Sequence, residues 1–174
     1  AVGCGRIVIG SPTEDSNKGA LLIYDINANF LKKVKWSTTE GELGAITRVN
    51  DGRIVASSQS NKTATSGTRW FTDFSIFDLN GNLIETVTPE NSAKLHDLAV
   101  GCGYIFAATN DTSGGAIKMY DLWGNQLKQW TPTGYTSTYS SSNLTAKFPT
   151  PGNVTMDIFD NNLVIGSLLD DRAW

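Results

Sequence analysis

The sequence lacks any hydrophobic run of the roughly 18 residues that a membrane-spanning helix needs. It also has little charge, because only 18% of its 174 residues are charged and the net charge is −3. The basic side chains are scattered rather than clustered, so we expect no nucleic-acid partner and no membrane insertion. The chain shows no signal peptide and no initiator Met, from which we expect a processed chain or a piece of a longer one.

The residues of familiar catalytic and metal sites are also scarce. No cysteine–histidine group has the spacing of a metal site, and no glycine-rich loop leads into a helix. The single histidine, His96, stands beside Asp97 and near Ser92, but nothing indicates that they form a triad, and we expect a surface or first-strand histidine. The sequence therefore offers no candidate catalytic, cofactor-binding or metal-binding residue, and we expect no enzymatic activity and no cofactor.

Only two cysteines are present, Cys4 and Cys102. Both occupy the same V-G-C-G turn in two copies of a repeat, where the other copies have Asp51 and Asp160. A disulfide requires Cα atoms within about 7 Å of each other, and equivalent positions in separate repeats should lie farther apart. We predict two free thiols rather than a disulfide, which fits assembly in a reducing cytosol.

What the sequence does have is a repeat, seen most fully in residues 99–129. Each copy reads as strand, tight turn, strand, polar loop, strand, tight turn, strand. The turn residues Gly5, Gly52, Gly103 and Asn161 are separated by 47, 51 and 58 positions. A repeat of this period indicates units that bury their faces by stacking on their neighbours.

The residue types at equivalent positions of the copies predict where the turns and strands lie. Glycine, Asn and Asp tolerate the positive φ of the first turn, so its four spellings predict one conformation. The aspartates of the Tyr-Asp or Phe-Asp motifs are interpreted as turn-initiating side chains that cap backbone N–H groups; they are Asp25, Asp78 and Asp121. The second strands are expected at 6–9, 53–55, 104–106 and 163–165, and the fourth strands at 30–35, 83–87 and 126–130.

No segment has helical periodicity with capping residues, so an all-β chain is expected. Four antiparallel strands per copy favour a β-propeller with about three and a half blades. The single domain 1–174 would comprise blades at 1–44, 45–93 and 94–151 and a partial blade at 152–174. Because residues 170–174 align with the start of a third strand, we do not expect the chain to close a propeller alone. A β-sandwich is the main alternative fold.

Strand order separates the connections into two faces. The tight turns share one face, and the variable polar loops share the other, at 11–19, 37–44, 57–68, 89–94, 109–115 and 131–151. Loops held by a rigid scaffold commonly carry binding sites. The loop face is therefore the candidate working surface, and its hydroxyl, Asn and aromatic side chains suit carbohydrate or protein contact.

The pattern V-G-C-G-R-I-V-I-G followed by I-F-D-L-N-G-N resembles FG-GAP-like propeller repeats, and especially those of virion proteins of marine tailed phages. The resemblance covers residues 1–34, 48–87, 98–130 and 157–166. It implies a propeller used for attachment or for decorating a particle, without enzymatic activity. The Ca²⁺ loop of integrin-type repeats is not matched, because Asp15, Asn17, Asn110 and Asp111 lack the alternating ligand spacing. We interpret them as polar loop residues.

The resemblance favours a structural or host-recognition component of a phage tail, fibre or capsid surface. Its partners would be other virion or surface proteins and a host-surface glycan or protein. The protein would then lie in the virion after assembly in the host cytoplasm. Two alternatives stay open: an extracellular microbial adhesion or cell-surface protein, and a propeller enzyme such as a quinoprotein or lyase. The enzyme would need acids, His or Arg converging at the axis.

Overall fold

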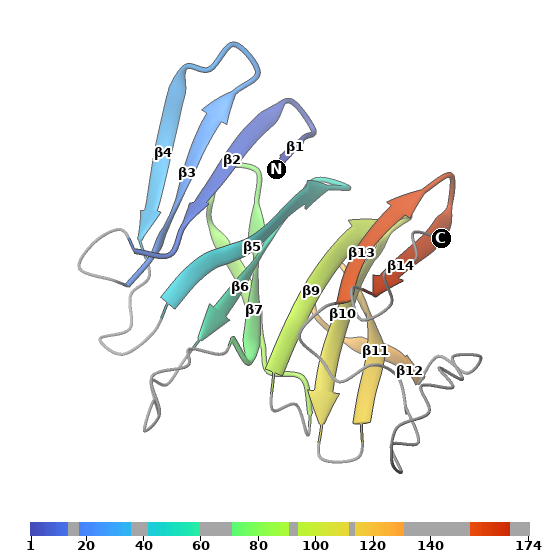
Figure 1. Cartoon of the computed structure of the whole chain (residues 1–174). Coiled ribbons are helices and arrows are strands. Elements are labelled where there is room, and N and C mark those ends of the chain that lie inside the picture. The colour runs from blue at the N-terminus through green and yellow to red at the C-terminus, as the bar shows by residue number, and fades with distance from the viewer. Residues whose placement is uncertain are drawn as a thin grey trace.

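The computed structural model describes residues 1–13, 18–35, 42–59, 71–90, 94–111, 114–130 and 154–167. Within these ranges the chain forms antiparallel strands and turns and no helix, as the all-β prediction requires (Figure 1). None of the described segments could therefore cross a membrane as a helix. The loop predicted at 131–151 and residues 168–174 lie outside the described ranges.

The described strands form three four-stranded sheets and one hairpin, each in sequence order. The first sheet contains β1 (Val2–Gly3), β2 (Arg6–Ser11), β3 (Ala20–Asp25) and β4 (Phe30–Lys35). The second contains β5 (Glu42–Asn50), β6 (Arg53–Gln59), β7 (Asp73–Asp78) and β8 (Leu83–Val87). The third contains β9 (Lys94–Gly101), β10 (Tyr104–Asp111), β11 (Gly114–Asp121) and β12 (Gln126–Trp130). The hairpin contains β13 (Val154–Phe159) and β14 (Asn162–Ser167).

The first turn of every copy has one conformation, as predicted. Its two central residues have positive φ in all four copies: Cys4 and Gly5, Asp51 and Gly52, Cys102 and Gly103, and Asp160 and Asn161. Two consecutive positive φ values are typical of the two-residue hairpin turn whose twist matches that of the flanking strands. The conformation is thus conserved between the copies although its residues differ.

The third and fourth strands also repeat their irregularity. In each sheet the register shifts immediately before the Asp-containing turn, at Ile23/Tyr24, Ile76/Phe77 and Met119/Tyr120. A bulge at this point bends the strand into the turn. The fourth strands have the predicted bounds in all three sheets.

Several predicted loops are shorter than expected, because polar residues continue the ladders. Thr109 and the two residues after it pair with Gly114–Ala116, so the predicted loop at 109–115 is mostly strand. Likewise, residues 57–59 belong to β6, residues 42–44 belong to β5, and Ser11 and Lys94 lie in strands.

The buried hydroxyls in these extensions are satisfied inside the sheets. Ser57 Oγ accepts from the Ile46 N–H at 2.9 Å, and Ser75 Oγ donates to Ser58 Oγ at 3.0 Å. A hydroxyl with a partner is compatible with a core position, so polarity alone was a poor signal for a loop.

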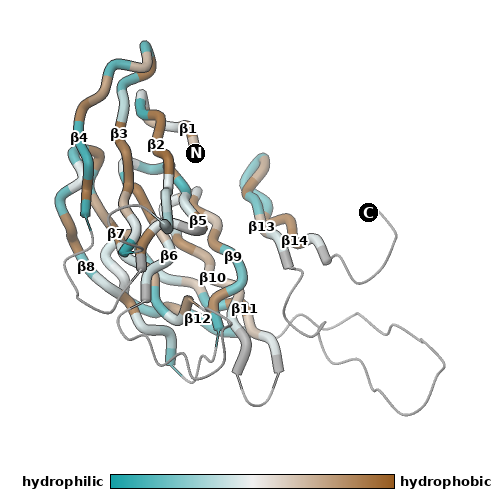
Figure 2. The backbone as a smooth tube through the Cα atoms, turned by 60° about the vertical axis from the view of Figure 1, so that its left-hand side comes forward, coloured by the Kyte–Doolittle hydropathy of each residue, from teal (hydrophilic) through white to brown (hydrophobic). Residues whose placement is uncertain are grey.

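Successive sheets stack face to face around strands β1, β5, β9 and β13, and the fourth strands lie outermost (Figures 1 and 2). We call the face that a sheet turns toward the preceding sheet its leading face, and the opposite face its trailing face. The leading faces comprise Val2, Ile7, Ile9, Leu22 and Tyr24; Val49, Ile54, Ala56 and Phe77; Val100, Ile105, Ala107 and Tyr120; and Ile158, Leu163 and Ile165.

Each junction between sheets has its own apolar core. Val8, Leu21 and Ile23 on the first trailing face pack in one cluster with the second leading face. Val55, Phe74 and Ile76 do the same toward the third sheet, where the Phe74 and Tyr120 rings meet edge to face. A smaller cluster around Ile117 and Met156 joins the third sheet to the hairpin. Stability therefore arises between neighbouring sheets rather than inside each one.

Candidate functional site

The tight-turn face is crossed by a row of contacts between neighbouring first turns. The Gly52 N–H points to Cys4 Sγ at 3.5 Å, and the Gly103 N–H donates to Asp51 Oδ2 at 2.7 Å. At the third junction, Cys102 Sγ donates to Asn161 Oδ1 at 3.1 Å. The residue before each turn glycine therefore reaches the following copy. Both cysteines are free, as predicted, and both are exposed.

Two equivalent arginines tie each first turn to the second turn of the next sheet. Arg6 Nε donates to the Leu79 carbonyl, and Arg53 Nε donates to the Leu122 carbonyl, each at 3.2 Å. The Arg53 guanidinium also lies 4.7 Å from the centre of the Trp123 ring. A planar fork with several N–H groups suits such a contact, because it satisfies carbonyls of both sheets at once. These arginines act between sheets, a role that no motif in the sequence predicts.

The aspartates of the second turns cap their backbone, as predicted. Asp78 Oδ1 accepts the N–H groups of Asn80 and Asn82 at 2.8 and 2.9 Å, and its Oδ2 accepts Asn82 Nδ2 at 2.8 Å. Asp25 and Asp121 make the same three contacts in their sheets. Hydrogen bonds from Asn82 lower the pKa of Asp78, and the equivalent asparagines lower those of the other two. These carboxylates are engaged in structure.

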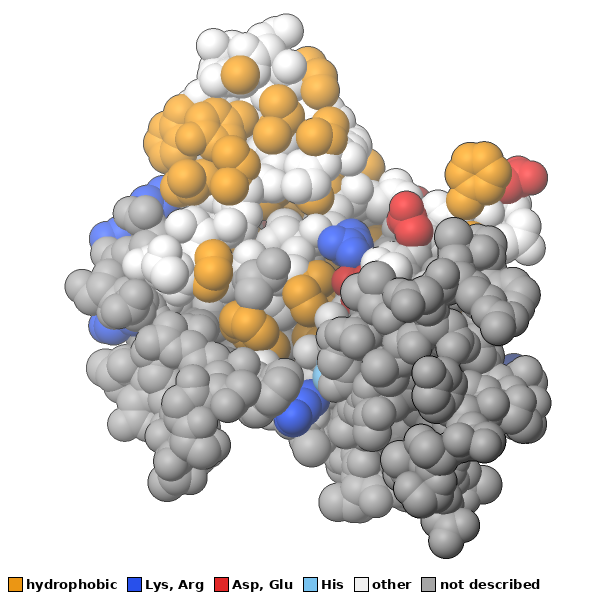
Figure 3. All heavy atoms as spheres, in the orientation of Figure 1, with side chains coloured by type: hydrophobic (Ala, Val, Ile, Leu, Met, Phe, Trp, Pro, Cys, Tyr) orange, Lys and Arg blue, Asp and Glu red, His pale blue; other side chains and the backbone are white. Residues whose placement is uncertain are grey.

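An open depression of about 540 Å³ lies where the first strands converge. It is the hollow near the centre of Figure 3, and it is lined by Ala1, Val8, Ile9, Gly10, Gly44, Ile46, Thr47, Arg48, Asp97 and Thr155. No group of three or more metal-ligating side chains occurs in the described part of the chain, so this hollow offers no metal centre there.

Asp97 is the central polar residue of the hollow and joins the second sheet, the third sheet and the hairpin. Its Oδ1 accepts from Arg48 Nη2 at 2.7 Å and from the Leu98 N–H at 2.8 Å, and its Oδ2 accepts from the Met156 N–H at 2.6 Å. The carboxylate is almost fully buried, whereas the Arg48 side chain keeps a third of its surface exposed. A buried carboxylate that accepts three hydrogen bonds from three strands holds these strands in place relative to one another. The sequence feature that could have indicated this role is the charged Asp97 within the otherwise mainly apolar segment L-H-D-L-A-V.

The structure does not bring the other residues singled out in the sequence together in one site within its described part. His96 lies on the first strand of its sheet, as predicted, with its Nε2 buried and unpaired. Burial, and then the charge of Lys94, lowers the pKa of His96 to about 4. Asn110 and Asp111 lie in the β10 ladder, with side chains outside the described part, and Asp15, Asn17 and Ser92 lie outside it altogether.

One apolar face stands out from this framework. In the part of the chain that the structure describes, no sheet covers the leading face of the first sheet. Val2 and Ile9 are 65% and 48% exposed, whereas their equivalents Val49 and Ala56 are 7% and 0% exposed. Figure 3 shows hydrophobic side chains gathered over this sheet. Within the described residues, the first sheet therefore presents to solvent a face whose counterparts in the other sheets are buried.

No protein-family model matches the chain, and no curated protein matches it in sequence. Three solved structures are similar to it over 96% of its length. They are the computationally designed Ika8 protein (15% identity, TM-score 0.56, 41% of that chain covered) and BamB from Moraxella catarrhalis (14%, 0.51, 41%). The third is a chain in the complex of KlAtg21 with the coiled-coil of AgAtg16 (11%, 0.61, 48%).

The chain thus spans less than half the length of each of these proteins. At such identities the likeness concerns the fold alone. The class that the fold defines is an all-β protein of successive four-stranded antiparallel sheets, with a propeller among its structural neighbours, since BamB is a β-propeller.

Proposed function

We propose that this chain is a non-enzymatic structural and recognition module of a phage particle, built from FG-GAP-like propeller blades. It would belong to a tail, fibre or capsid surface and contact other virion proteins. Its loop face would contact a host-surface glycan or protein.

The observation that carries the proposal is that the repeated polar groups are engaged in structure. Asp25, Asp78 and Asp121 close turns, and Arg6 and Arg53 join sheets. A catalytic acid, base or nucleophile must instead be free to meet its substrate. Such a framework supports a scaffold whose specificity resides in loops.

The propeller part of the proposal is supported by the stacking. Sheets follow one another in sequence order, each joined to the next by its own core and by repeated polar contacts. Radial repetition of four-stranded sheets is the propeller arrangement. The likeness to BamB supports it at the level of the fold.

Mass spectrometry of density-purified phage particles tests this function. We expect peptides of this chain, such as residues 95–118, to co-purify with the major capsid protein and to persist after a high-salt wash. A phage replication enzyme from the same lysate serves as the control that must be absent. If the peptides occur only in the secretome or envelope of the host, the proposal is wrong and a microbial adhesion role replaces it.

A further inference from the structure

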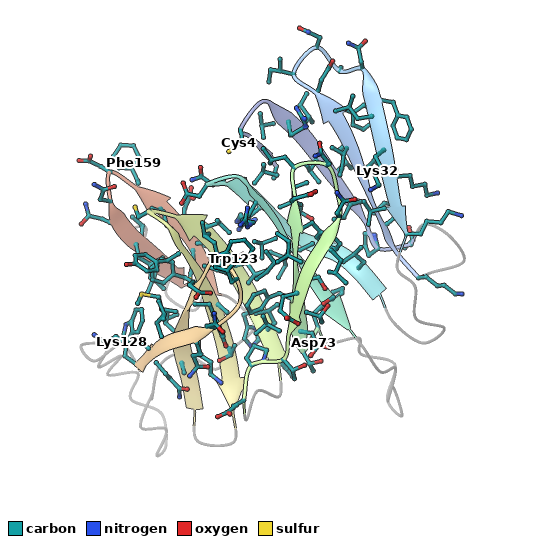
Figure 4. The ribbon with its side chains drawn as sticks, turned by 180° about the vertical axis from the view of Figure 1, so that it is seen from behind. Cys4, Lys32, Asp73, Trp123, Lys128 and Phe159 are labelled. Atoms are coloured by element: carbon teal, nitrogen blue, oxygen red, sulfur yellow. The ribbon has the colours of Figure 1, made fainter. Side chains whose placement is uncertain are left out.

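Trp123 lies in the second turn of the third sheet, on the tight-turn face, and this turn does not need its side chain (Figure 4). At this position each sheet uses only the backbone N–H, which donates to the turn aspartate, and the other two copies have Asn27 and Asn80. The indole is 61% exposed. The turn therefore accounts for the backbone of this residue and leaves its large aromatic side chain without a structural role there.

Neighbouring sheets do not cover this position. Asn80 belongs to the second sheet, which packs on the first sheet on one side and on the third sheet on the other, and Asn80 is nevertheless exposed. Leu83, which follows the same turn, is 55% exposed between the same two neighbours. The exposure of Trp123 is thus a property of the turn position, and it does not result from a missing neighbour.

Arg53 holds the indole from one side. Its guanidinium lies 4.7 Å from the ring centre and is fixed by hydrogen bonds to the Leu122 and Gly52 carbonyls, each at 3.2 Å. Arg6 makes the same two kinds of contact at the preceding junction, so the repeat sets the guanidinium and the third sheet adds the ring. Trp and Arg are enriched at the energetic centres of interfaces, and a ring that is already held loses less freedom on binding.

The tight-turn face also carries the net charge of the chain. The charged residues in or next to the described turns are Asp25, Asp51, Asp78, Asp121, Asp160, Arg6 and Arg53. Their sum of −3 equals the net charge of the whole chain, so the remaining sequence is neutral. Hydrogen bonds within the second turns lower the pKa of three of these aspartates, which keeps them ionised at neutral pH. A face with this field attracts a basic partner and repels an acidic one.

We propose that the tight-turn face docks a partner protein that presents basic side chains around an apolar cleft, with Trp123 inserted into that cleft as the anchor. This surface is separate from the loop face, and the proposal does not depend on a virion role. The aspartates orient the partner, and burial of the indole supplies most of the affinity. A neutral glycan would use the indole but not the charge, so the charge favours the basic protein.

NMR titration of the ¹⁵N-labelled chain with a defined probe tests the surface. The probe is a capped peptide, Lys-Lys-Leu-Gly-Leu-Lys-Lys, and its counterpart with Glu in place of every Lys is the control. We expect the basic peptide to bind with a Kd at or below about 1 mM and to shift the amide signals of residues 50–53, 78–82 and 121–125. Signals of residues 57–59 and 94–96, at the loop end of the sheets, should not move.

Two matched variants test the anchor. Trp123→Asn gives this turn the residue type of the other copies, so the fold is retained, and it should weaken binding of the basic peptide about tenfold. Leu127→Asn is the control, since Leu127 is 51% exposed on the edge strand β12 and lies outside the turn; it should change the affinity less than about twofold. Circular dichroism checks that both variants keep the strand content of the parent.

The results separate the possibilities. Turn-face binding of the basic peptide, weakened by Trp123→Asn and not by Leu127→Asn, supports the proposal. It is overturned by no binding at about 5 mM peptide, by shifts confined to the loop end, or by equal affinities of the parent and Trp123→Asn. Shifts of the turn amides with maltotriose but not with the basic peptide would show a glycan site and would also overturn it. Absence of the chain from phage particles would refute the proposed function and would leave this result unchanged.

Discussion

A single carboxylate closes each turn that follows a third strand. Asp78 accepts two backbone N–H groups and one side-chain amide, and Asp25 and Asp121 repeat the arrangement. The same carboxylate conformation in three sequence contexts shows that the Asp and the Asn four residues later specify the turn together. The three intervening residues are not the same in any two copies (Ile-Asn-Ala, Leu-Asn-Gly and Leu-Trp-Gly), whereas the Asp and the Asn never change.

Asp78→Ala should therefore destabilise the chain by about 1 kcal/mol, a modest value because the turn is exposed to solvent. Asn80→Ala is the matched control, since the contact at that position uses the backbone N–H. Urea unfolding measures both variants. An equal effect of the two substitutions would contradict the capping role.

Acid should act on the same turns. The pKa of Asp78 is lowered from 3.8 in the folded chain, chiefly by the Asn82 backbone N–H. The contribution of this carboxylate to the free energy of unfolding is therefore complete above pH 3.8, and it is lost as the pH falls through the pKa of the folded state. Carbon-detected NMR titration should show Asp25, Asp78 and Asp121 all titrating below 3.8. Titration at or above 3.8 would contradict the hydrogen bonds.

His96 should make stability depend on pH in a higher window. Its pKa falls from 6.5 to about 4 on folding, because burial disfavours the imidazolium and Lys94 adds repulsion. Between pH 6.5 and pH 4 the unfolded chain binds more protons, so stability should decrease as the pH is lowered. We expect a loss on the order of 1 kcal/mol, since the partial exposure of the ring reduces the effect. In His96→Phe, the free energy of unfolding, measured with denaturant at a series of pH values, should change less between pH 6.5 and pH 4 than in the parent. An equal change in both proteins would mean that other groups cause the pH dependence.

At the scale of elements, the second turns are pressed against the preceding sheet. A Cβ added to Gly81 would lie 2.6 Å from Val34 Cγ2 and 2.7 Å from Ile23 Cδ1. A Cβ on Gly124 would lie 2.7 Å from Val87 Cγ2, in the same relation to the second sheet. Lys32 of β4 (Figure 4) adds a hydrogen bond to the Gly81 carbonyl at 3.3 Å. The turn is thus both a connection within its sheet and part of the junction.

A pair of glycine substitutions separates the two roles. Gly52 and Gly81 have φ values of +74° and +71°, but a Cβ at Gly52 would meet nothing within 4 Å. Gly52→Ala should cost about 1 kcal/mol from backbone strain alone, and Gly81→Ala about 2–4 kcal/mol because it also overpacks the junction. Thermal unfolding of the two variants measures the difference. Equal costs would mean that the second turn does not contact the preceding sheet.

The sequence predicted elements best where turn chemistry limits them. The fourth strands were placed correctly because the Asp turn and its Asn define where they begin. The second strands were placed too short, because Ser57, Ser58 and Thr109 read as loop residues although their hydroxyls are satisfied within the sheet. The Arg48–Asp97 pair could not be predicted, since it joins strands of different copies whose stacking the sequence does not encode locally.

At the scale of the whole molecule, consecutive sheets pack on each other in the same way at the first and second junctions. Ile23 meets the Gly81 turn, and one copy later Ile76 meets the Gly124 turn. Arg6 and Arg53 repeat the polar part of the same relation. In a β-sandwich, the alternative fold that the sequence left open, two sheets face each other. The same contact would not then recur between the first and second sheets and between the second and third.

Methyl NOE spectroscopy tests this repeated stacking most directly. We expect NOEs from the Ile23 δ1 methyl to the Gly81 Hα atoms and from the Ile76 δ1 methyl to the Gly124 Hα atoms. The Cβ positions built on these glycines lie 2.7 and 3.4 Å from the two methyl carbons. The absence of both NOEs in a folded, strand-rich chain, or contacts between the first and third sheets in their place, would contradict the stacking.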